Sequence, residues 1–198
     1  MKLLVATNNP GKLAEYHPLL AELPLEIISL REAGINFEPA ETGLTFEENA
    51  VLKARAHAER SGLLTLADDS GLEIDALYGE PGVHSARYEG TGRGEDVKRY
   101  QSVLRKLDGV PWENRTARFR CVVAVATPDG LVETVEGTVE GFIGLEPQGE
   151  YGFGYDPIFF IPEYNCTMAQ LAPEVKNRIS HRARAVEAAL PILRRHGS

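Results

Sequence analysis

Cysteine is scarce in this chain of 198 residues, and so is positive charge. The two cysteines, Cys121 and Cys166, are too few and too far apart for a zinc site or a disulfide framework, so we expect reduced thiols and a cytoplasmic protein. Because 29 acidic side chains outnumber 21 basic ones, the formal net charge is −8, which argues against nucleic acid as a partner. An anionic ligand would therefore have to meet a local cluster of cations.

Long hydrophobic runs are also lacking. The apolar run at residues 3–6 is shorter than the hydrophobic region of a signal peptide, and no run approaches the roughly 20 residues that cross a bilayer. We therefore expect neither secretion nor a membrane partner. The remaining composition, 43% hydrophobic and 25% charged, is that of an average globular protein and excludes collagenous, coiled-coil and disordered classes. The length predicts one domain, residues 1–198, with two lobes.

The first half of the chain alternates strand and helix signals. Asn9 followed by Pro10 is typical of an N-cap and first helical position, and Thr45 with Glu48 forms a capping box. Strands are predicted at residues 2–6, 25–29, 63–67 and 72–76, and helices from residue 10 and from residue 45 to residue 61. This alternation predicts an α/β arrangement.

The second half adds a hairpin to this pattern. A helix is predicted over residues 95–107, then an antiparallel hairpin of residues 117–127 and 131–140, then a final helix that Ser180 caps. Residues 141–155 are rich in glycine, which is typical of a loop that approaches a ligand. We predict an α/β fold with an elongated mixed β-sheet, flanking helices and two lobes with an active-site cleft between them.

The segment TNNPGK, residues 7–12, follows a predicted strand and opens a helix. Backbone N–H groups and the helix dipole favour an anion there, and Lys12 adds a full positive charge. The spacing is neither that of the Walker loop nor that of the dinucleotide fingerprint, so an ordinary capped helix with a solvated lysine explains the segment equally well. The segment is a candidate phosphate cradle.

Asp68 and Asp69 are adjacent acids at the predicted end of an apolar strand, where ligands of α/β sheets bind. Carboxylate oxygens with bound water suit Mg²⁺, and this ion with a triphosphate would offset the repulsion between the two acids. Glu41 is a loop acid that helix capping does not explain, so it could complete a metal site. The alternatives are a solvated aspartate-rich turn and an idle surface glutamate.

Two later segments suit the base of a nucleotide. Residues 153–156 place two aromatic rings and a carboxylate beside a glycine, which can stack a nucleobase and bond its edge, although core packing would also explain them. Lys176, His181 and Arg182 gather cations near the start of the final helix, where the helix dipole disfavours them. A bound anion or base carbonyl is one explanation, and a solvated basic turn is the other.

Six stretches, taken in order, resemble the inosine/xanthosine triphosphate pyrophosphatase family, whose members hydrolyse non-standard purine nucleoside triphosphates to the monophosphate and pyrophosphate. They are TNNPGK at 7–12, ETGLTFEENAVLKA at 41–54, LADDSGLEIDAL at 66–77, PGVHSARY at 81–88, GFGYDPIFF at 152–160 and SHRARA at 180–185. Together they span nearly the whole chain, and their order makes coincidence a poor explanation.

The resemblance implies a two-lobed α/β fold, a homodimer and an enzyme that depends on Mg²⁺. Asp69 matches the catalytic base of such enzymes, and Glu41 and Asp69 match the metal ligands, with Asp68 as a competitor. The substrate-binding residues carried over are Thr7, Asn8, Asn9, Pro10, Gly11, Lys12, Lys53, Ser70, Phe153, Gly154, Tyr155, Asp156, Lys176, His181 and Arg182.

The predicted reaction is attack of water on the α-phosphorus of ITP, dITP or XTP. Asp69 would remove the proton of the water, and Lys12 and Lys53 would stabilise the leaving pyrophosphate. Hypoxanthine and xanthine present a 6-oxo acceptor and an N1 donor, and adenine reverses both, so donors from His181 and Arg182 would reject adenine. Two alternatives stay open: a pyrophosphatase for other modified or pyrimidine nucleotides, and a purine-nucleotide-binding protein without hydrolytic activity.

Overall fold

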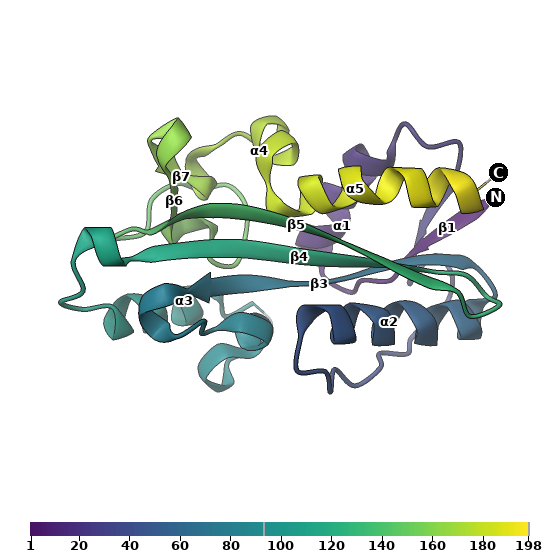
Figure 1. The fold of residues 1–198 in the computed structure, drawn as a ribbon, viewed down its shortest axis with the longest axis horizontal. Coiled ribbons are helices and arrows are strands. Elements are labelled where there is room, and N and C mark those ends of the chain that lie inside the picture. Colours follow the sequence, from purple (N-terminus) through teal and green to yellow (C-terminus); the bar gives the residue numbers. More distant parts are fainter. Residues whose placement is uncertain (93, 198) are drawn as a thin grey trace. The chain divides into compact units, whose positions relative to one another are not determined.

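The computed structural model of the protein describes residues 1–92 and 94–197. Its strands are β1 (Lys2–Val5), β2 (Glu26–Ser29), β3 (Leu64–Ile74), β4 (Thr116–Ala126), β5 (Val132–Ile143), β6 (Phe159–Ile161) and β7 (Cys166–Thr167). Its α-helices are α1 (Pro10–Leu20), α2 (Phe46–Ser61), α3 (Asp96–Lys106), α4 (Pro173–Ile179) and α5 (His181–His196). The described strands form one sheet in the order β2-β1-β3-β4-β5-β6-β7, with parallel and antiparallel pairs, so the prediction of a mixed α/β fold is confirmed (Figure 1).

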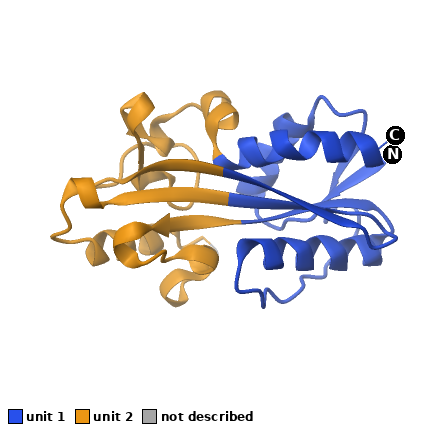
Figure 2. Ribbon diagram, in the orientation of Figure 1, with its two compact units in different colours: residues 1–69, 121–137, 181–198 blue, residues 70–120, 138–180 orange. Residues whose placement is uncertain are grey.

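The chain divides into two compact units, each assembled from separate segments (Figure 2). Unit 1 contains residues 1–69, 121–137 and 181–198, and unit 2 contains residues 70–120 and 138–180. Each unit has a hydrophobic core of its own. That the two form one bilobal domain stays a prediction.

Unit 1 is an α/β layer structure. β1 pairs in parallel with β2 and with β3, and its residues Leu3 and Val5 are fully buried. α5 covers one face of these strands and α2 covers the other, while α1 packs against α5 (Figure 1). The predicted cap at Asn9 is confirmed, because its side chain accepts N–H bonds at the start of α1. The helix α2 ends at residue 61 as predicted, and Gly62 follows it in the left-handed conformation. Helices on both faces leave the inner strands dry, as parallel strands require.

Unit 2 contains the start of β4, residues 116–120, and the end of β5, residues 138–143. β5 pairs with β6 and β6 with β7, both antiparallel. The rings of Phe119 and Phe159 lie 4.4 Å apart between centroids in its core. Two glycines of residues 141–155 are required by packing within the unit, and the approach of this segment to a ligand stays a prediction. A Cβ on Gly141 would come within 2.5 Å of the Phe160 carbonyl oxygen, and one on Gly149 within 2.2 Å of the Ala169 backbone.

Two elements differ from the sequence prediction. β3 runs unbroken from Leu64 to Ile74, so Asp68 and Asp69 lie inside a strand and not at its end. The sequence predicts that the strand ends at these acids because Asp and Ser favour turns, but pairing with neighbouring strands overrides that preference. A separate short helix, α4, also precedes the final helix, and Lys176 lies in its last turn, where the dipole favours a cation.

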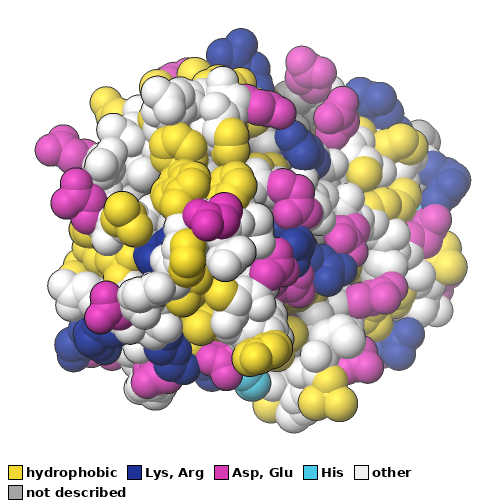
Figure 3. Space-filling view, turned by 60° about the vertical axis from the view of Figure 1, so that its left-hand side comes forward, with side chains coloured by type: hydrophobic (Ala, Val, Ile, Leu, Met, Phe, Trp, Pro, Cys, Tyr) yellow, Lys and Arg dark blue, Asp and Glu magenta, His cyan; other side chains and the backbone are white. Residues whose placement is uncertain are grey.

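The surface carries mixed charge. On the face shown in Figure 3, acidic and basic side chains are interspersed, and the described residues form no broad basic patch there. In the described part of the chain, no helix combines the length and the apolar character that crossing a membrane requires.

Gly137 of β5 offers a test of the packing in unit 1. A Cβ at this position would lie 2.2 Å from the His181 carbonyl oxygen and 2.4 Å from the Ala185 amide nitrogen, so α5 can approach β5 only over a glycine. We expect Gly137→Ala to lower the free energy of unfolding by about 3 kcal/mol, because the backbone of α5 must move away. Urea denaturation followed by circular dichroism measures this change.

The matched control is Gly92→Ala, because the nearest atom to a Cβ at Gly92 is a flexible Glu95 carboxylate oxygen at 3.5 Å. This variant should change stability by about 0.5 kcal/mol or less. Equal denaturation midpoints for the two variants would contradict the tight contact.

Candidate functional site

The turn of residues 7–12 is fixed by its own side chains. Asn9 Oδ1 accepts the N–H groups of Gly11 (2.9 Å) and Lys12 (3.2 Å), and Thr7 Oγ1 accepts that of Asn9 (3.2 Å). These amides are among those that a helix N-terminus would offer to an anion, and Asn9 already uses two of them. The main positive group left at this turn is therefore the side chain of Lys12.

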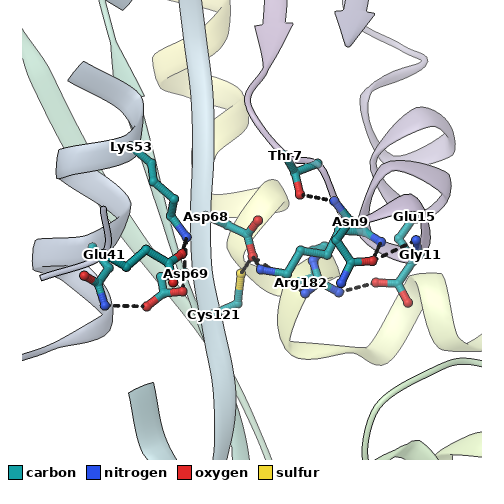
Figure 4. Close-up of polar contacts among 12 residues, drawn as sticks. Thr7, Asn9, Gly11, Glu15, Glu41, Lys53, Asp68, Asp69, Cys121 and Arg182 are labelled. Carbon is teal, nitrogen blue, oxygen red and sulfur yellow. Dashed lines mark hydrogen bonds and ion pairs between the residues drawn. The ribbon is translucent and has the colours of Figure 1, made fainter. Parts of the chain in front are cut away.

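The two adjacent aspartates point to opposite sides of β3 (Figure 4). Successive side chains of a strand alternate between faces, and both acids lie within a continuous strand. The structure therefore does not bring the Asp68 and Asp69 carboxylates together as the sequence predicted.

On one face of β3, Asp68 belongs to a buried charge cluster. Its Oδ2 accepts a hydrogen bond from Lys12 Nζ at 2.7 Å and lies 3.6 Å from Arg182 Nη2. Arg182 is only 1% exposed and also pairs with Glu15. Burial opposes ionisation of Asp68, but the Lys12 and Arg182 cations hold its pKa well below its usual range. Asp68 thus stays charged and fixes the ammonium group of Lys12.

Cys121 lies beside this cluster, with Sγ 3.7 Å from Asp68 Oδ2 (Figure 4). Burial raises the pKa of the Cys121 thiol, so it stays protonated and can donate to the carboxylate. The prediction of free thiols is confirmed for both cysteines.

On the other face of β3, Asp69 joins Lys53 and Glu41. Lys53 Nζ donates to Glu41 Oε1 at 2.8 Å and to Asp69 Oδ1 at 3.1 Å, so one ammonium group bridges two carboxylates. Burial raises the pKa of Asp69. Burial would lower the pKa of Lys53, but Asp69 and the other nearby carboxylates raise it above its ordinary value. The lysine is therefore charged, and Asp69 is the acid of this cluster that protonates more readily than a free aspartate.

Asn49 of α2, which the sequence analysis missed, holds this cluster in place. Its Nδ2 donates to Asp69 Oδ2 at 3.0 Å, and its Oδ1 accepts the Gly43 N–H at 2.8 Å. A Cβ on Gly43 would lie 2.7 Å from Asn49 Oδ1, so only glycine lets the loop that carries Glu41 come this close. The sequence feature that could have indicated Asn49 is its place inside a predicted helix, because asparagine is unfavourable there.

The donor set around Lys53 fits a magnesium ion. Mg²⁺ in phosphate-handling sites is bound by one or two carboxylates, with substrate phosphates and water as the other ligands. Glu41 and Asp69 lie within bonding distance of one cation, the Lys53 ammonium. Asp68 points away from this pair, and the described residues contain no group of three or more acidic, His or Cys side chains that would form a complete protein cage.

In unit 2, three of the predicted base-contacting residues come together. Asp156 Oδ2 accepts the Phe153 N–H at 2.9 Å and also bonds Lys176 Nζ, which lies 4.8 Å from the centroid of the Phe153 ring. A Cβ on Gly152 would lie 2.0 Å from Asp156 Oδ2, which explains that glycine. An aromatic ring, a carboxylate and an ammonium group thus form one cluster.

The predicted site residues fall in both units. Unit 1 holds Thr7, Asn8, Asn9, Pro10, Gly11, Lys12, Glu41, Lys53, Asp68, Asp69, His181 and Arg182, and unit 2 holds Ser70, Phe153, Gly154, Tyr155, Asp156 and Lys176. His181 and Arg182 begin α5 and are buried, so the alternative explanation, a solvated basic turn, does not hold at these two residues.

Comparison with known proteins identifies the family. The model of the Ham1 family matches residues 3–192. The chain belongs to the Ham1 family. It is 51% identical over 195 residues to a dITP/XTP pyrophosphatase of Desulforamulus reducens, covering 98% of this chain and 96% of the relative. It is 50% identical to a dITP/XTP pyrophosphatase of Bacillus subtilis, covering 93% and 92%.

A solved Ham1 protein from Coxiella burnetii has the same fold. It superposes with a TM-score of 0.87 at 42% sequence identity and covers 98% of each chain. The resemblance inferred from the six motifs is therefore confirmed at the level of the Ham1 family.

Asn49→Ala tests how the Asp69 cluster of this Ham1 protein is held. The substitution leaves Asp69 Oδ2 and the Gly43 N–H without their partner, and Asn49 is fully buried. We expect the free energy of unfolding to fall by about 1–3 kcal/mol. Asn8→Ala, at an exposed position, is the control and should be nearly neutral. Urea titration of both variants measures the difference, and an unchanged midpoint for Asn49→Ala would show that Asn49 does not hold the cluster.

Proposed function

We propose that the protein hydrolyses the non-standard purine nucleoside triphosphates ITP, dITP and XTP to the nucleoside monophosphate and pyrophosphate. Relatives named dITP/XTP pyrophosphatase are about 50% identical in sequence to this chain, over nearly its whole length. The observation that carries the proposal in this chain is the cluster of Asp69, Lys53 and Glu41, which joins a buried carboxylate to a charged lysine. Such a cluster combines a proton acceptor with a phosphate-binding cation.

Mg²⁺ is the proposed cofactor, with Glu41 and Asp69 as its protein ligands. When bound to substrate, the ion would neutralise the charge that develops on the phosphate oxygens. The requirement for this ion follows from the local balance of charge. In the ion pairs described for the two clusters on β3, four acids face three cations: Glu15, Glu41, Asp68 and Asp69 against Lys12, Lys53 and Arg182. A bare triphosphate would therefore be repelled, and a divalent cation reverses that balance.

The chain's own residues supply the remaining roles. Asp69 would accept the proton of the attacking water, since its burial raises its pKa toward the range in which a carboxylate is an effective base. Lys53 and Lys12 would stabilise charge on the phosphates, and Asp68 would hold Lys12 rather than bind metal. Thr7, Asn8, Asn9, Pro10, Gly11 and Ser70 complete the proposed phosphate-binding set.

The base would be bound by residues 153–156, Lys176, His181 and Arg182. The Phe153 ring offers a stacking surface, and donors directed at the 6-oxo group would favour hypoxanthine and xanthine over adenine. Arg182 has such donors, and its guanidinium is buried and paired with Glu15 and Asp68. The homodimer and the cytoplasmic location stay predictions from the sequence.

Product analysis tests the proposed reaction. With ITP and Mg²⁺ we expect IMP and pyrophosphate in equal amounts, and chelation by EDTA should abolish turnover until Mg²⁺ is restored. IDP with inorganic phosphate would exclude attack at the α-phosphorus. The panel includes XTP, dITP, dUTP and the four standard dNTPs. An equal or faster rate with a pyrimidine nucleotide would overturn the purine assignment, and binding of ITP without turnover would favour a nucleotide-binding protein.

Asp69→Asn tests the proposed base. The amide cannot accept the proton, so we expect kcat to fall by about 10²–10⁴. Binding of ITP, measured by calorimetry in the presence of Ca²⁺, should remain. The matched control is Asp75→Asn, which removes an exposed carboxylate paired with Arg118 and should leave kcat unchanged. Wild-type kcat in Asp69→Asn would remove the assigned role.

A further inference from the structure

The segment of residues 153–156 is attached to helix α3. Asp96, the first residue of α3, accepts the Gly154 N–H through Oδ2 at 2.7 Å, across 58 positions of sequence. An acid in the first turn of a helix ordinarily needs no explanation beyond the helix dipole. Here the same carboxylate also holds the backbone at the centre of a distant loop.

The other oxygen of Asp96 connects the helix to a second segment. Its Oδ1 bonds Arg99, which lies one turn further along α3. Arg99 is buried, with 6% of its surface exposed. Arg99 Nη1 in turn donates to the carbonyl oxygens of Ala86 (3.0 Å) and Gly92 (2.7 Å). Residues 82–90 form a 3-10 segment that is kinked at residues 87–89 and contains most of the motif PGVHSARY, to which the proposed function assigns no role. Arg99 therefore fixes this motif to α3.

The two segments also contact each other directly. Tyr155 Oη donates to the Ser85 carbonyl oxygen at 2.8 Å, and Ser85 Oγ accepts the Leu72 N–H of β3 at 2.9 Å. Loop 153–156 is thus held at Gly154 by Asp96 and at Tyr155 by the motif that Arg99 secures. Every one of these contacts lies within unit 2.

We propose that Asp96 and Arg99 form a positioning pair that sets the placement of residues 153–156 and thereby the affinity and selectivity for the base. The inference rests on the proposed function, which places the base against these residues. Neither side chain needs to touch substrate. Their effect passes through the backbone at Gly154, next to the Phe153 ring and two residues before Asp156. A shift of about 1 Å in such a loop is enough to weaken a binding contact.

Steady-state kinetics of two Asp96 variants test the pair. Asp96→Ala removes the acceptor of the Gly154 N–H, and we expect KM for ITP to rise about tenfold, kcat to change less than about twofold, and the preference for ITP over ATP to fall. Asp96→Asn keeps an oxygen that can accept this bond but carries no charge for Arg99. Its KM should rise in the same direction by about threefold. Inhibition by inorganic pyrophosphate, which has no base, should be unchanged in both variants.

The control is Lys98→Ala, which removes the exposed partner of Glu95 on the same helix and should keep wild-type KM. A merely structural defect lowers the amount of active enzyme and therefore kcat, but it does not separate KM for ITP from inhibition by pyrophosphate. Wild-type KM and selectivity in both Asp96 variants would overturn the pair while leaving the proposed function intact. If Asp96→Ala does not fold, the comparison of KM for ITP between Asp96→Asn and Lys98→Ala tests the proposed pair. Absence of ITP turnover in the wild-type protein would overturn the proposed function and this inference with it.

Discussion

Two aspartates placed next to each other in a buried strand must each be neutralised, because an unpaired carboxylate in a dry interior costs several kcal/mol. On one face of β3, Asp68 pairs with Lys12 and Arg182. On the other face, Asp69 pairs with Lys53 and accepts a hydrogen bond from Asn49. The partners of Asp68 come from α1 and α5, and both partners of Asp69 come from α2. The positions of α1, α2 and α5 around β3 are therefore linked to the charges on a single dipeptide.

This arrangement gives the two acids different chemical properties. Asp68 is locked by two cations, its pKa is held well below the usual range, and its role is to fix Lys12. Asp69 shares one lysine with Glu41, and its pKa is raised by burial, so it is the one acid of the pair suited to exchange a proton or a ligand. The alternation of the strand thus gives the two acids of the sequence DD different surroundings: Asp68 is held by two cations, and Asp69 has its pKa raised by burial.

Local signals predicted local features well. The structure confirms the caps at Asn9 and Thr45, the end of α2 at residue 61 and the hairpin of β4 and β5. All of these follow from chemistry within a few residues. The continuity of β3 could not be predicted, since it depends on neighbouring strands that stabilise a turn-forming sequence. Asn49 was missed for a similar reason: its partners are the Gly43 backbone and Asp69, which only the tertiary fold brings to α2.

The contacts of α3 show why motif resemblance alone gives an incomplete account of a site. The stretches PGVHSARY and GFGYDPIFF are far apart in sequence, and α3 lies in neither of them. Yet Asp96 and Arg99 connect both, through the Gly154 N–H on one side and the Ala86 and Gly92 carbonyls on the other. These bonds use backbone groups of the two stretches. The side-chain sequence of the motifs therefore does not reveal that α3 contacts them. A helix outside the recognisable motifs can thus influence how the motif residues meet a base, and substitutions there would alter selectivity while leaving the phosphate-binding acids and lysines of unit 1 unchanged.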